Sequence, residues 1–170
     1  HGDGWRRYLL DTLLGSEATV RSILAAFAAT PDLGMVFPRI WDPVEGAINW
    51  GYEFERARAL AQRMGIVITP EAPLEFPAGS MFWVRGAALG PLLQLGLSHQ
   101  DFPVEDGLIH GSLAHAIERL FLHVCEAAGY RWVSIAPDRA DTGDLIRIAS
   151  AEDVSALLDR RGHPLLLPSR

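Results

Sequence analysis

The sequence predicts a single α/β domain over residues 1–170, in which helices alternate with short buried strands. Apolar residues recur at helical spacing in several segments, most clearly at 112–128. Short apolar runs lie between these segments, and glycine or proline stands at most of the boundaries. With 170 residues, of which 49% are hydrophobic, the chain can bury a core without disulfides or structural metals.

The elements predicted for the first half follow from apolar spacing and from residues that begin or end helices. A first helix is predicted over 5–14 and ended by Gly15. Ser16 is a suitable N-cap for a second helix, which Pro31 ends. The predicted buried stripe of this helix is Val20, Ile23, Leu24 and Phe27. The remaining elements are a buried strand at 33–37, a loop at 39–50, a helix at 52–64 ended by Gly65, and strand ends with loop at 66–78.

The second half contains the strongest predicted helix, over 112–128, which Gly129 closes. Its predicted buried stripe is Leu113, Ile117, Leu120, Phe121 and Val124. The other elements are a strand at 80–85, a short helix at 87–95, a polar loop at 98–110, strands at 130–136 and 145–148, and a helix at 151–161.

Composition excludes several classes of protein. The net charge is −6 with scattered arginines and no lysine, which argues against nucleic acid as the main partner. No apolar run approaches the roughly 18 residues that a membrane-spanning helix needs. Cys125 is the single cysteine, so no internal disulfide can form, and its apolar neighbours predict an inert buried thiol. A cytosolic location fits this cysteine usage.

Residues 76–85 are the first candidate site. Gly79 permits a backbone conformation or a close approach that other residues forbid. Met81, Phe82 and Trp83 could stack on a ring, and Arg85 could bind a phosphate through paired hydrogen bonds. The alternative is a buried strand. Because three bulky neighbours cannot all point to one face of a sheet, at least one must line a helix layer or a pocket.

The second candidate site precedes the long helix. Asp101, Glu105, Asp106 and His110 come within ten residues, just before a helix N-terminus, where the dipole favours anions. A base here could deprotonate a sugar hydroxyl, or the carboxylates could hold a divalent cation such as Mg²⁺ or Mn²⁺. The alternative is a solvated loop with capping acids.

The third candidate site is on the long helix, where His115, Glu118 and Arg119 share one face. They could form a catalytic or phosphate-binding group, or an ordinary set of surface ion pairs. His115 and Glu118 are spaced to bind a metal, but the second histidine of an HExxH motif is absent, so zinc is not expected.

Taken in order, these segments resemble the rhamnan synthesis protein F family. The resemblance covers roughly residues 1–135, and its densest motifs are AGSMFWVR at 78–85 and AHAIER at 114–119. The other resembling positions are 4–6, 33–34, Pro38, Phe76, 101–102, Glu105, Gly111 and 129–130.

The resemblance implies a glycosyltransferase that passes a sugar from a nucleotide-sugar donor, such as deoxythymidine-diphosphate rhamnose, to a glycan or lipid-linked glycan of a cell-surface polysaccharide. The implied fold is the C-terminal part of a GT-A-like glycosyltransferase, a short mixed sheet flanked by helices. The nucleotide-binding half is then expected upstream of His1. The implied location is cytoplasmic, with at most peripheral contact at the inner face of the plasma membrane.

The resemblance also assigns roles. Glu105, with Asp106 or His110, would activate the acceptor hydroxyl, although the family leads us to expect an aspartate where His110 stands. The wall beneath the sugars would be Gly79, Ser80, Met81, Phe82 and Trp83. The charged groups or diphosphate would be positioned by His115, Glu118 and Arg119. Two alternatives stay open: a non-catalytic glycan-binding or assembly module of the same fold, and a metal-dependent hydrolase.

Overall fold

A computed structural model describes residues 2–46, 48–102 and 112–136. Within them, three strands form one mixed sheet in the order β2-β1-β3. The strands are β1 (Leu33–Pro38), β2 (Trp83–Val84) and β3 (Arg131–Ile135). β1 pairs parallel with β3 and antiparallel with β2. The predicted α/β class and the short mixed sheet are therefore confirmed.

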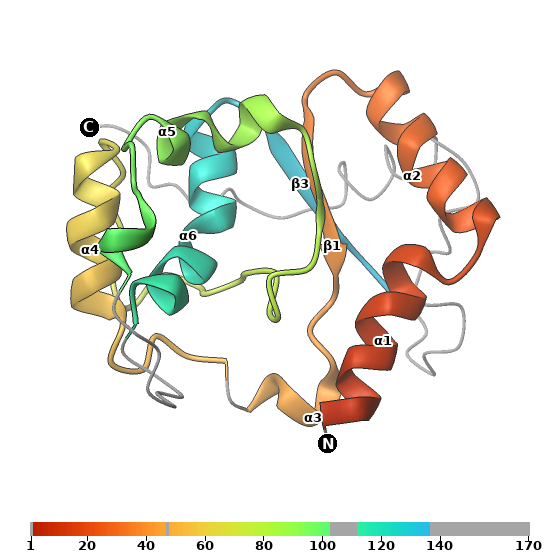
Figure 1. The fold of residues 1–170 in the computed structure, drawn as a ribbon, viewed down its shortest axis with the longest axis horizontal. Helices are drawn as coiled ribbons and strands as arrows, with labels where there is room; N and C mark the ends of the chain where they lie inside the picture. The colour runs from red at the N-terminus through yellow and green to blue at the C-terminus, as the bar shows by residue number, and fades with distance from the viewer. Residues whose placement is uncertain (1, 47, 103–111, 137–170) are drawn as a thin grey trace.

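The helices lie in two layers, one on each face of this sheet (Figure 1). One layer is formed by α1 (Gly2–Leu14) and α2 (Glu17–Ala29). The other contains α4 (Phe54–Arg63), α5 (Gly90–Leu93) and α6 (Leu113–Ala127), with α6 nearest the sheet. The short elements are α3 (Asp42–Glu45) and the 3₁₀ turns η1 (Gly86–Leu89) and η2 (His99–Asp101). Among the described residues, no helix is long and apolar enough to cross a membrane.

The central strand β1 connects the two layers. All six of its residues are buried. Val36 packs with Ile23 of α2 on one face, and Phe37 packs with Leu122 of α6 on the other. A strand covered on both faces is expected to be a continuous apolar run, which is how residues 33–37 appear in the sequence.

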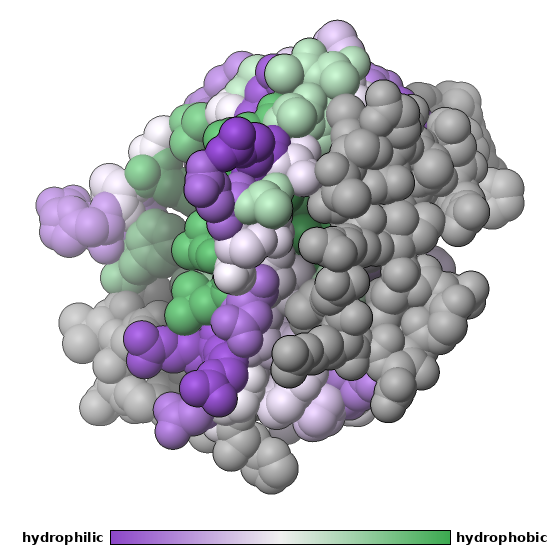
Figure 2. All heavy atoms as spheres, turned by 90° about the vertical axis from the view of Figure 1, so that its right-hand side faces the viewer, coloured by the Kyte–Doolittle hydropathy of each residue, from purple (hydrophilic) through white to green (hydrophobic). Residues whose placement is uncertain are grey.

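The outer faces of α1 and α2 are mixed in character. Figure 2 shows this side of the molecule, with hydrophilic side chains beside apolar ones. Leu24 is 51% exposed here, so its predicted place in the buried stripe of α2 is wrong. Ala26 is buried instead, beside Ile23. Leu24 and Ala26 lie on opposite sides of Ile23 around the helix axis, so the buried stripe is rotated from the predicted one toward Ala26.

Most local predictions are confirmed. The helices and strands predicted at 5–14, 16–30, 33–37, 52–64, 112–128 and 130–136 all form, with ends within about three residues. Ser16 caps α2 by accepting a hydrogen bond from the Thr19 amide. Gly65 and Gly129 follow helices with φ of 72° and 81°, the left-handed conformation that ends many helices. The elements predicted at 145–148 and 151–161 lie outside the described residues.

Four local predictions need correction. No strand forms within residues 66–78, where strand ends were predicted. The strand predicted at 80–85 is reduced to Trp83–Val84, because Gly79 and Ser80 adopt left-handed φ values of 87° and 53°. The predicted loop at 39–50 contains the single turn α3, with Pro43 in its first turn. The predicted helix at 87–95 is a 3₁₀ turn followed by one α-helical turn.

The burial of α6 differs from the single stripe predicted. Leu120 and Val124 pack toward α4 as expected, but Leu122 and Cys125 are also fully buried, against the sheet. The helix is buried on two sides because it lies between α4 and the sheet. Cys125 is buried, as predicted.

Gly34 sets how closely α6 and η1 approach β1. A Cβ at this position would lie 2.5 Å from Tyr130 Cβ, 2.7 Å from Cys125 Sγ and 2.9 Å from Ala88 Cβ. We predict that Gly34→Ala lowers the free energy of unfolding by about 1–3 kcal/mol, because the layers must move apart. Urea unfolding measures this. Gly86→Ala is the matched control, since a Cβ there would meet nothing within 4 Å. Equal midpoints for the two variants would contradict this account.

His123 makes the stability of the domain depend on pH. Its side chain is 1% exposed, and its ring nitrogens make no hydrogen bond to a described residue. Burial lowers the pKa of His123, opposed in part by Glu126 and by the Arg119 backbone. Below pH about 6.5 the unfolded chain therefore gains a proton that the folded state does not accept until its own lower pKa is reached.

We predict that stability falls as the pH drops below about 6.5, with a limiting slope of about 1.4 kcal/mol per pH unit. His123→Leu removes the titrating group and should flatten this part of the profile. Urea midpoints at several pH values between 5 and 8 provide the measurement. His99→Gln serves as the control, because His99 is exposed. A profile that His123→Leu leaves unchanged would show that another group causes the acid loss.

Candidate functional site

The carboxyl ends of β1 and β3 define one edge of the sheet, which we call the carboxyl edge. Because β2 runs antiparallel to β1, the residues that precede Trp83 lie at this same edge. α6 leads directly into β3, so its first turns also lie there. α/β sheets commonly place ligands outside the carboxyl ends of their strands. The carboxyl edge is therefore where a functional site is expected.

The Gly79–Ser80 turn is the most unusual backbone at this edge. Ser80 has a φ of 53° and is the one non-glycine residue with positive φ in the described part of the chain. Gly79 has a φ of 87°, and a Cβ there would lie 2.8 Å from Leu9 Cδ1 and 3.3 Å from Trp5 Cζ2. Both properties that the sequence predicted for Gly79 are thus confirmed. Left-handed backbone at a non-glycine residue costs about 1–2 kcal/mol and often marks a functional region.

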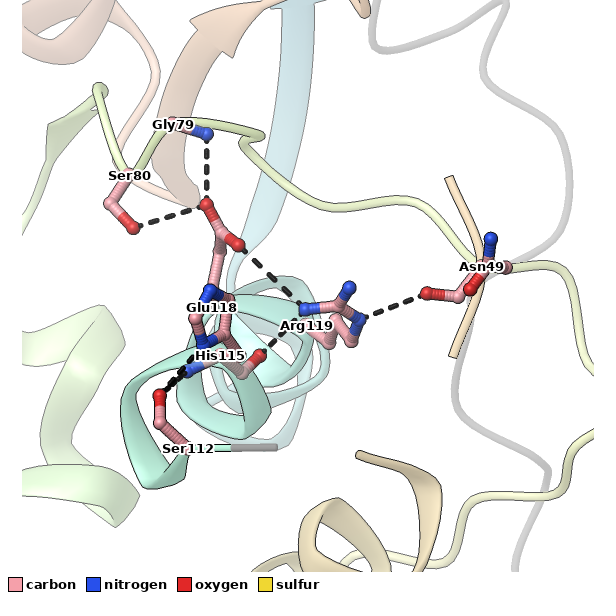
Figure 3. A network of polar contacts seen from close by, with 7 residues as sticks. All are labelled: Asn49, Gly79, Ser80, Ser112, His115, Glu118 and Arg119. Atoms are coloured by element: carbon pink, nitrogen blue, oxygen red, sulfur yellow. Dashed lines mark hydrogen bonds and ion pairs between the residues drawn. The ribbon is translucent and has the colours of Figure 1, made fainter. Parts of the chain in front are cut away.

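Glu118 of α6 holds this turn in place. One carboxylate oxygen accepts hydrogen bonds from the Gly79 amide at 2.8 Å and from the Ser80 hydroxyl at 3.3 Å (Figure 3). The other oxygen lies 3.8 Å from Arg119 Nη1. The Gly79–Ser80 turn of the first candidate site and Glu118 of the third are therefore in contact.

Arg119 is an internal cation. Its side chain is 6% exposed and donates hydrogen bonds to the carbonyls of Asn49 and His115, at 2.9 and 3.1 Å. Its guanidinium carbon lies 5.0 Å from the centre of the Phe76 ring. These contacts tie α6 to the segment before α4 (Figure 3). The alternative of a surface ion pair does not hold for Arg119, and a role in positioning diphosphate stays a prediction.

His115 lies beside Glu118, partly buried. Its Nδ1 is 2.7 Å from the hydroxyl of Ser112, the N-cap of α6, which also accepts a hydrogen bond from the His115 amide. The hydroxyl can donate to Nδ1 or accept from it, depending on the tautomer of the ring. The N-cap thus orients the ring of His115.

The bulky residues after the turn pack into both layers. Met81 and Trp83 contact the core cluster of α1 and α2, whereas the Phe82 ring lies 4.8 Å from that of Phe121 on α6. The Trp83 indole also donates to the Leu13 carbonyl, at 3.3 Å. The prediction that these three neighbours face different layers is confirmed. Their role beneath a sugar stays a prediction.

Arg85 lies away from the carboxyl edge. It follows β2, and its guanidinium donates hydrogen bonds to the carbonyls of Leu33 and Phe27, at 3.2 and 2.7 Å. It also lies 5.7 Å from the centre of the Phe27 ring. The structure therefore does not bring Arg85 together with His115 and Glu118. Its predicted phosphate contact would have to form at the other end of β2.

The second candidate site lies mostly outside the described residues. Glu105, Asp106 and His110 belong to 103–111, so their predicted catalytic roles stay predictions. Asp101 is described and exposed, and it accepts hydrogen bonds from the amide and hydroxyl of Ser98. These bonds lower its pKa, which fits the alternative of a capping acid. Within the described ranges, no group of three metal-binding side chains occurs.

An aromatic group at the carboxyl edge was missed as a site. Tyr8 of α1 and Trp41, which precedes α3, stack with ring centres 6.3 Å apart and an angle of 26°. Trp5 lies beside Gly79. Tyr8 and Trp41 are 33 residues apart, and local spacing carries no signal that would join them. The two tryptophans of the 39–50 loop were the available hint.

Comparison with known proteins identifies a family. The model of rhamnan synthesis protein F matches residues 1–130. Two curated relatives, both named uncharacterized protein WxcX, come from Xanthomonas campestris pv. campestris strains B100 and ATCC 33913. Each is 36% identical over 135 residues, which is 79% of this chain and 19% of the relative. The chain thus spans about a fifth of the length of these relatives. No solved structure matches the chain significantly.

Glu118 can be tested as the residue that fixes the Gly79–Ser80 turn. We predict that Glu118→Ala leaves the partly buried Gly79 amide without its acceptor, at a cost of about 1–3 kcal/mol. Amide hydrogen exchange at Gly79 should become faster, and the urea midpoint should fall. Glu118→Gln is the matched control, because its side-chain carbonyl can accept the same bonds. Unchanged protection of Gly79 in Glu118→Ala would contradict this role.

Proposed function

The chain belongs to the rhamnan synthesis protein F family, and on this premise we propose that it is part of a glycosyltransferase of cell-surface polysaccharide synthesis. The proposed donor is a nucleotide-activated sugar such as deoxythymidine-diphosphate rhamnose. The proposed acceptor is a growing glycan, free or lipid-linked. The proposed location is the cytoplasm, with contact at the inner face of the plasma membrane through the acceptor.

One observation carries the proposal. Segments that resemble the family, and that are far apart in the sequence, meet at the carboxyl edge. Trp5 lies against Gly79, and Gly79 is hydrogen-bonded to Glu118 of the AHAIER motif. The strand β1 ends at Pro38 at the same edge. Because α/β sheets commonly bind ligands at this edge, the meeting of these segments supports a functional use of the motifs.

Within this proposal, the Gly79–Ser80 turn forms the wall beneath the reacting sugars. Ser80 is exposed, and His115 and Glu118 lie beside it. The proposed base is Glu105, with Asp106 or His110. The carboxylates of this segment could also hold Mg²⁺ or Mn²⁺.

A GT-A-like architecture is part of the proposal. The three-stranded mixed sheet between helix layers is compatible with the C-terminal part of such a fold. The non-catalytic glycan-binding module remains the second candidate. The observation in its favour is that Arg85 and Arg119 donate hydrogen bonds to backbone carbonyls of the protein, so these donors are already used within the fold and not by a diphosphate. The metal-dependent hydrolase gains no support from the described residues.

The function can be tested by comparing glycosyl transfer by the wild-type protein with transfer by the Glu105→Gln variant. The assay follows transfer of labelled rhamnose from deoxythymidine-diphosphate rhamnose to a rhamnan acceptor, with the full protein that carries these residues. We predict that Glu105→Gln lowers kcat by about 10²–10⁴-fold, the usual contribution of a general base. Glu71→Gln is the matched control, since Glu71 is an exposed loop carboxylate elsewhere.

Unchanged turnover in Glu105→Gln would remove Glu105 from the mechanism. Saccharide binding without any transfer by the wild-type protein would instead support the non-catalytic module.

A further inference from the structure

Three aromatic side chains at the carboxyl edge are left out of the hydrophobic core. Trp5, Tyr8 and Trp41 belong to none of the core clusters, and each is partly exposed. Trp5 and Tyr8 are three residues apart on α1, so they share one face of that helix. Large aromatic side chains usually dominate cores, so their collection at a ligand edge requires another explanation.

The backbone of α1 leaves room for the Trp41 ring. A Cβ at Gly4 would lie 3.2 Å from Trp41 Cη2 and 3.5 Å from Cζ2, so the indole rests directly against this glycine. Tyr8, one turn further along α1, stacks with the same indole. The Tyr8 hydroxyl donates a hydrogen bond to the Arg39 carbonyl at 3.0 Å. We call Trp41 and Tyr8 together the aromatic shelf. Trp41 is held by its contacts with Gly4 and Tyr8, and Tyr8 by its hydrogen bond to the Arg39 carbonyl.

Charges of both signs border this shelf. The side chains of Arg39 and Asp42 are exposed and make no hydrogen bond or ion pair to a described residue. Both act on the Tyr8 hydroxyl. Burial raises the pKa of Tyr8, while the Arg39 charge lowers it and the Asp42 charge raises it. The phenol therefore stays protonated near neutral pH, and its oxygen retains a lone pair that can accept a further hydrogen bond.

We propose that Tyr8, Trp41, Arg39 and Asp42 form a saccharide-binding subsite for a neutral pyranose of the acceptor glycan. The apolar face of a pyranose matches an aromatic ring, and its hydroxyls need both donors and acceptors, which the arginine and the aspartate supply. A diphosphate fits less well, because Asp42 would repel it. This inference rests on the proposed function and names the substrate that this part of the edge would bind.

The subsite adjoins the Gly79–Ser80 turn through Trp5. The Trp5 ring lies 3.3 Å from the point where a Gly79 Cβ would be, and Tyr8 follows Trp5 on the same helix face. A glycan whose terminal sugar reacts at the turn could therefore place a neighbouring sugar on the Tyr8–Trp41 shelf. Such a subsite would hold the acceptor in register without touching the reacting atoms.

Binding of methyl α-L-rhamnopyranoside tests the subsite without any donor or turnover. Saturation-transfer NMR and titration should show a dissociation constant in the millimolar range, about what a single sugar on an open surface can reach. We predict that Trp41→Ala weakens binding by about tenfold or more, and Tyr8→Phe by about threefold. Tyr130→Phe is the matched control for Tyr8→Phe, since Tyr130 lies at the opposite edge, before β3. It should bind as the wild type does.

Circular dichroism and the urea midpoint establish that each variant is folded, and Gly4→Ala provides a second, milder change that displaces the Trp41 ring. Equal binding by folded Trp41→Ala and wild type would overturn the subsite, as would a wild type that does not bind the probe. Binding of thymidine 5′-diphosphate that depends on Trp41, with no binding of the glycoside, would overturn it in favour of a donor site. Because no transfer is measured, loss of transferase activity alone would contradict the proposed function and leave this result standing.

Discussion

The burial of β1 on both faces is the constraint on which the rest of the described structure depends. A strand with six buried residues needs an apolar layer on each side, and α1 with α2 supplies one while α6 with η1 supplies the other. Gly34 lets the α6 side approach closely. Because β1 and β3 are parallel, the helix that leads into β3 must begin at the carboxyl edge. The position of His115 and Glu118 at this edge is thus a consequence of the topology.

The polar network at this edge is stabilised by hydrogen bonds more than by charge. Glu118 and Arg119 are 16% and 6% exposed and 3.8 Å apart, a long separation for an ion pair. Two partly desolvated charges gain little from each other unless further hydrogen bonds satisfy them. Here the Gly79 amide satisfies the carboxylate, and the Asn49 carbonyl satisfies the guanidinium. Glu118 and Arg119 therefore connect α6 to the Gly79–Ser80 turn and to the segment before α4. Removing both side chains would break these connections.

The sequence predicted the parts of the fold that local chemistry determines. Ser16 predicted the start of a helix, and Gly65 and Gly129 predicted the C-terminal ends of two others. The apolar run at 33–37 predicted a buried strand. The misjudged features depend on distant partners. Arg119 is buried because its acceptor lies 70 residues earlier, and helical spacing alone placed it on an outer face. The shelf of Tyr8 and Trp41 joins two elements that no local pattern connects. The family resemblance did bring Gly79 and Glu118 into one hypothesis, although their hydrogen bond could not be foreseen.

Ser80 differs from the other residues of these motifs, because packing inside the protein does not explain it. Arg85, Arg119, Phe82 and Trp83 each have partners inside the protein that explain them. At Ser80 the turn requires a positive φ, which glycine would adopt at lower cost, by about 1 kcal/mol. The Ser80 hydroxyl donates only a long hydrogen bond, of 3.3 Å, to the Glu118 carboxylate. The same oxygen already accepts a shorter hydrogen bond, of 2.8 Å, from the Gly79 amide. Packing therefore does not account for a serine at this exposed position. Under the proposed function, this exposed hydroxyl at the carboxyl edge would instead contact the sugar.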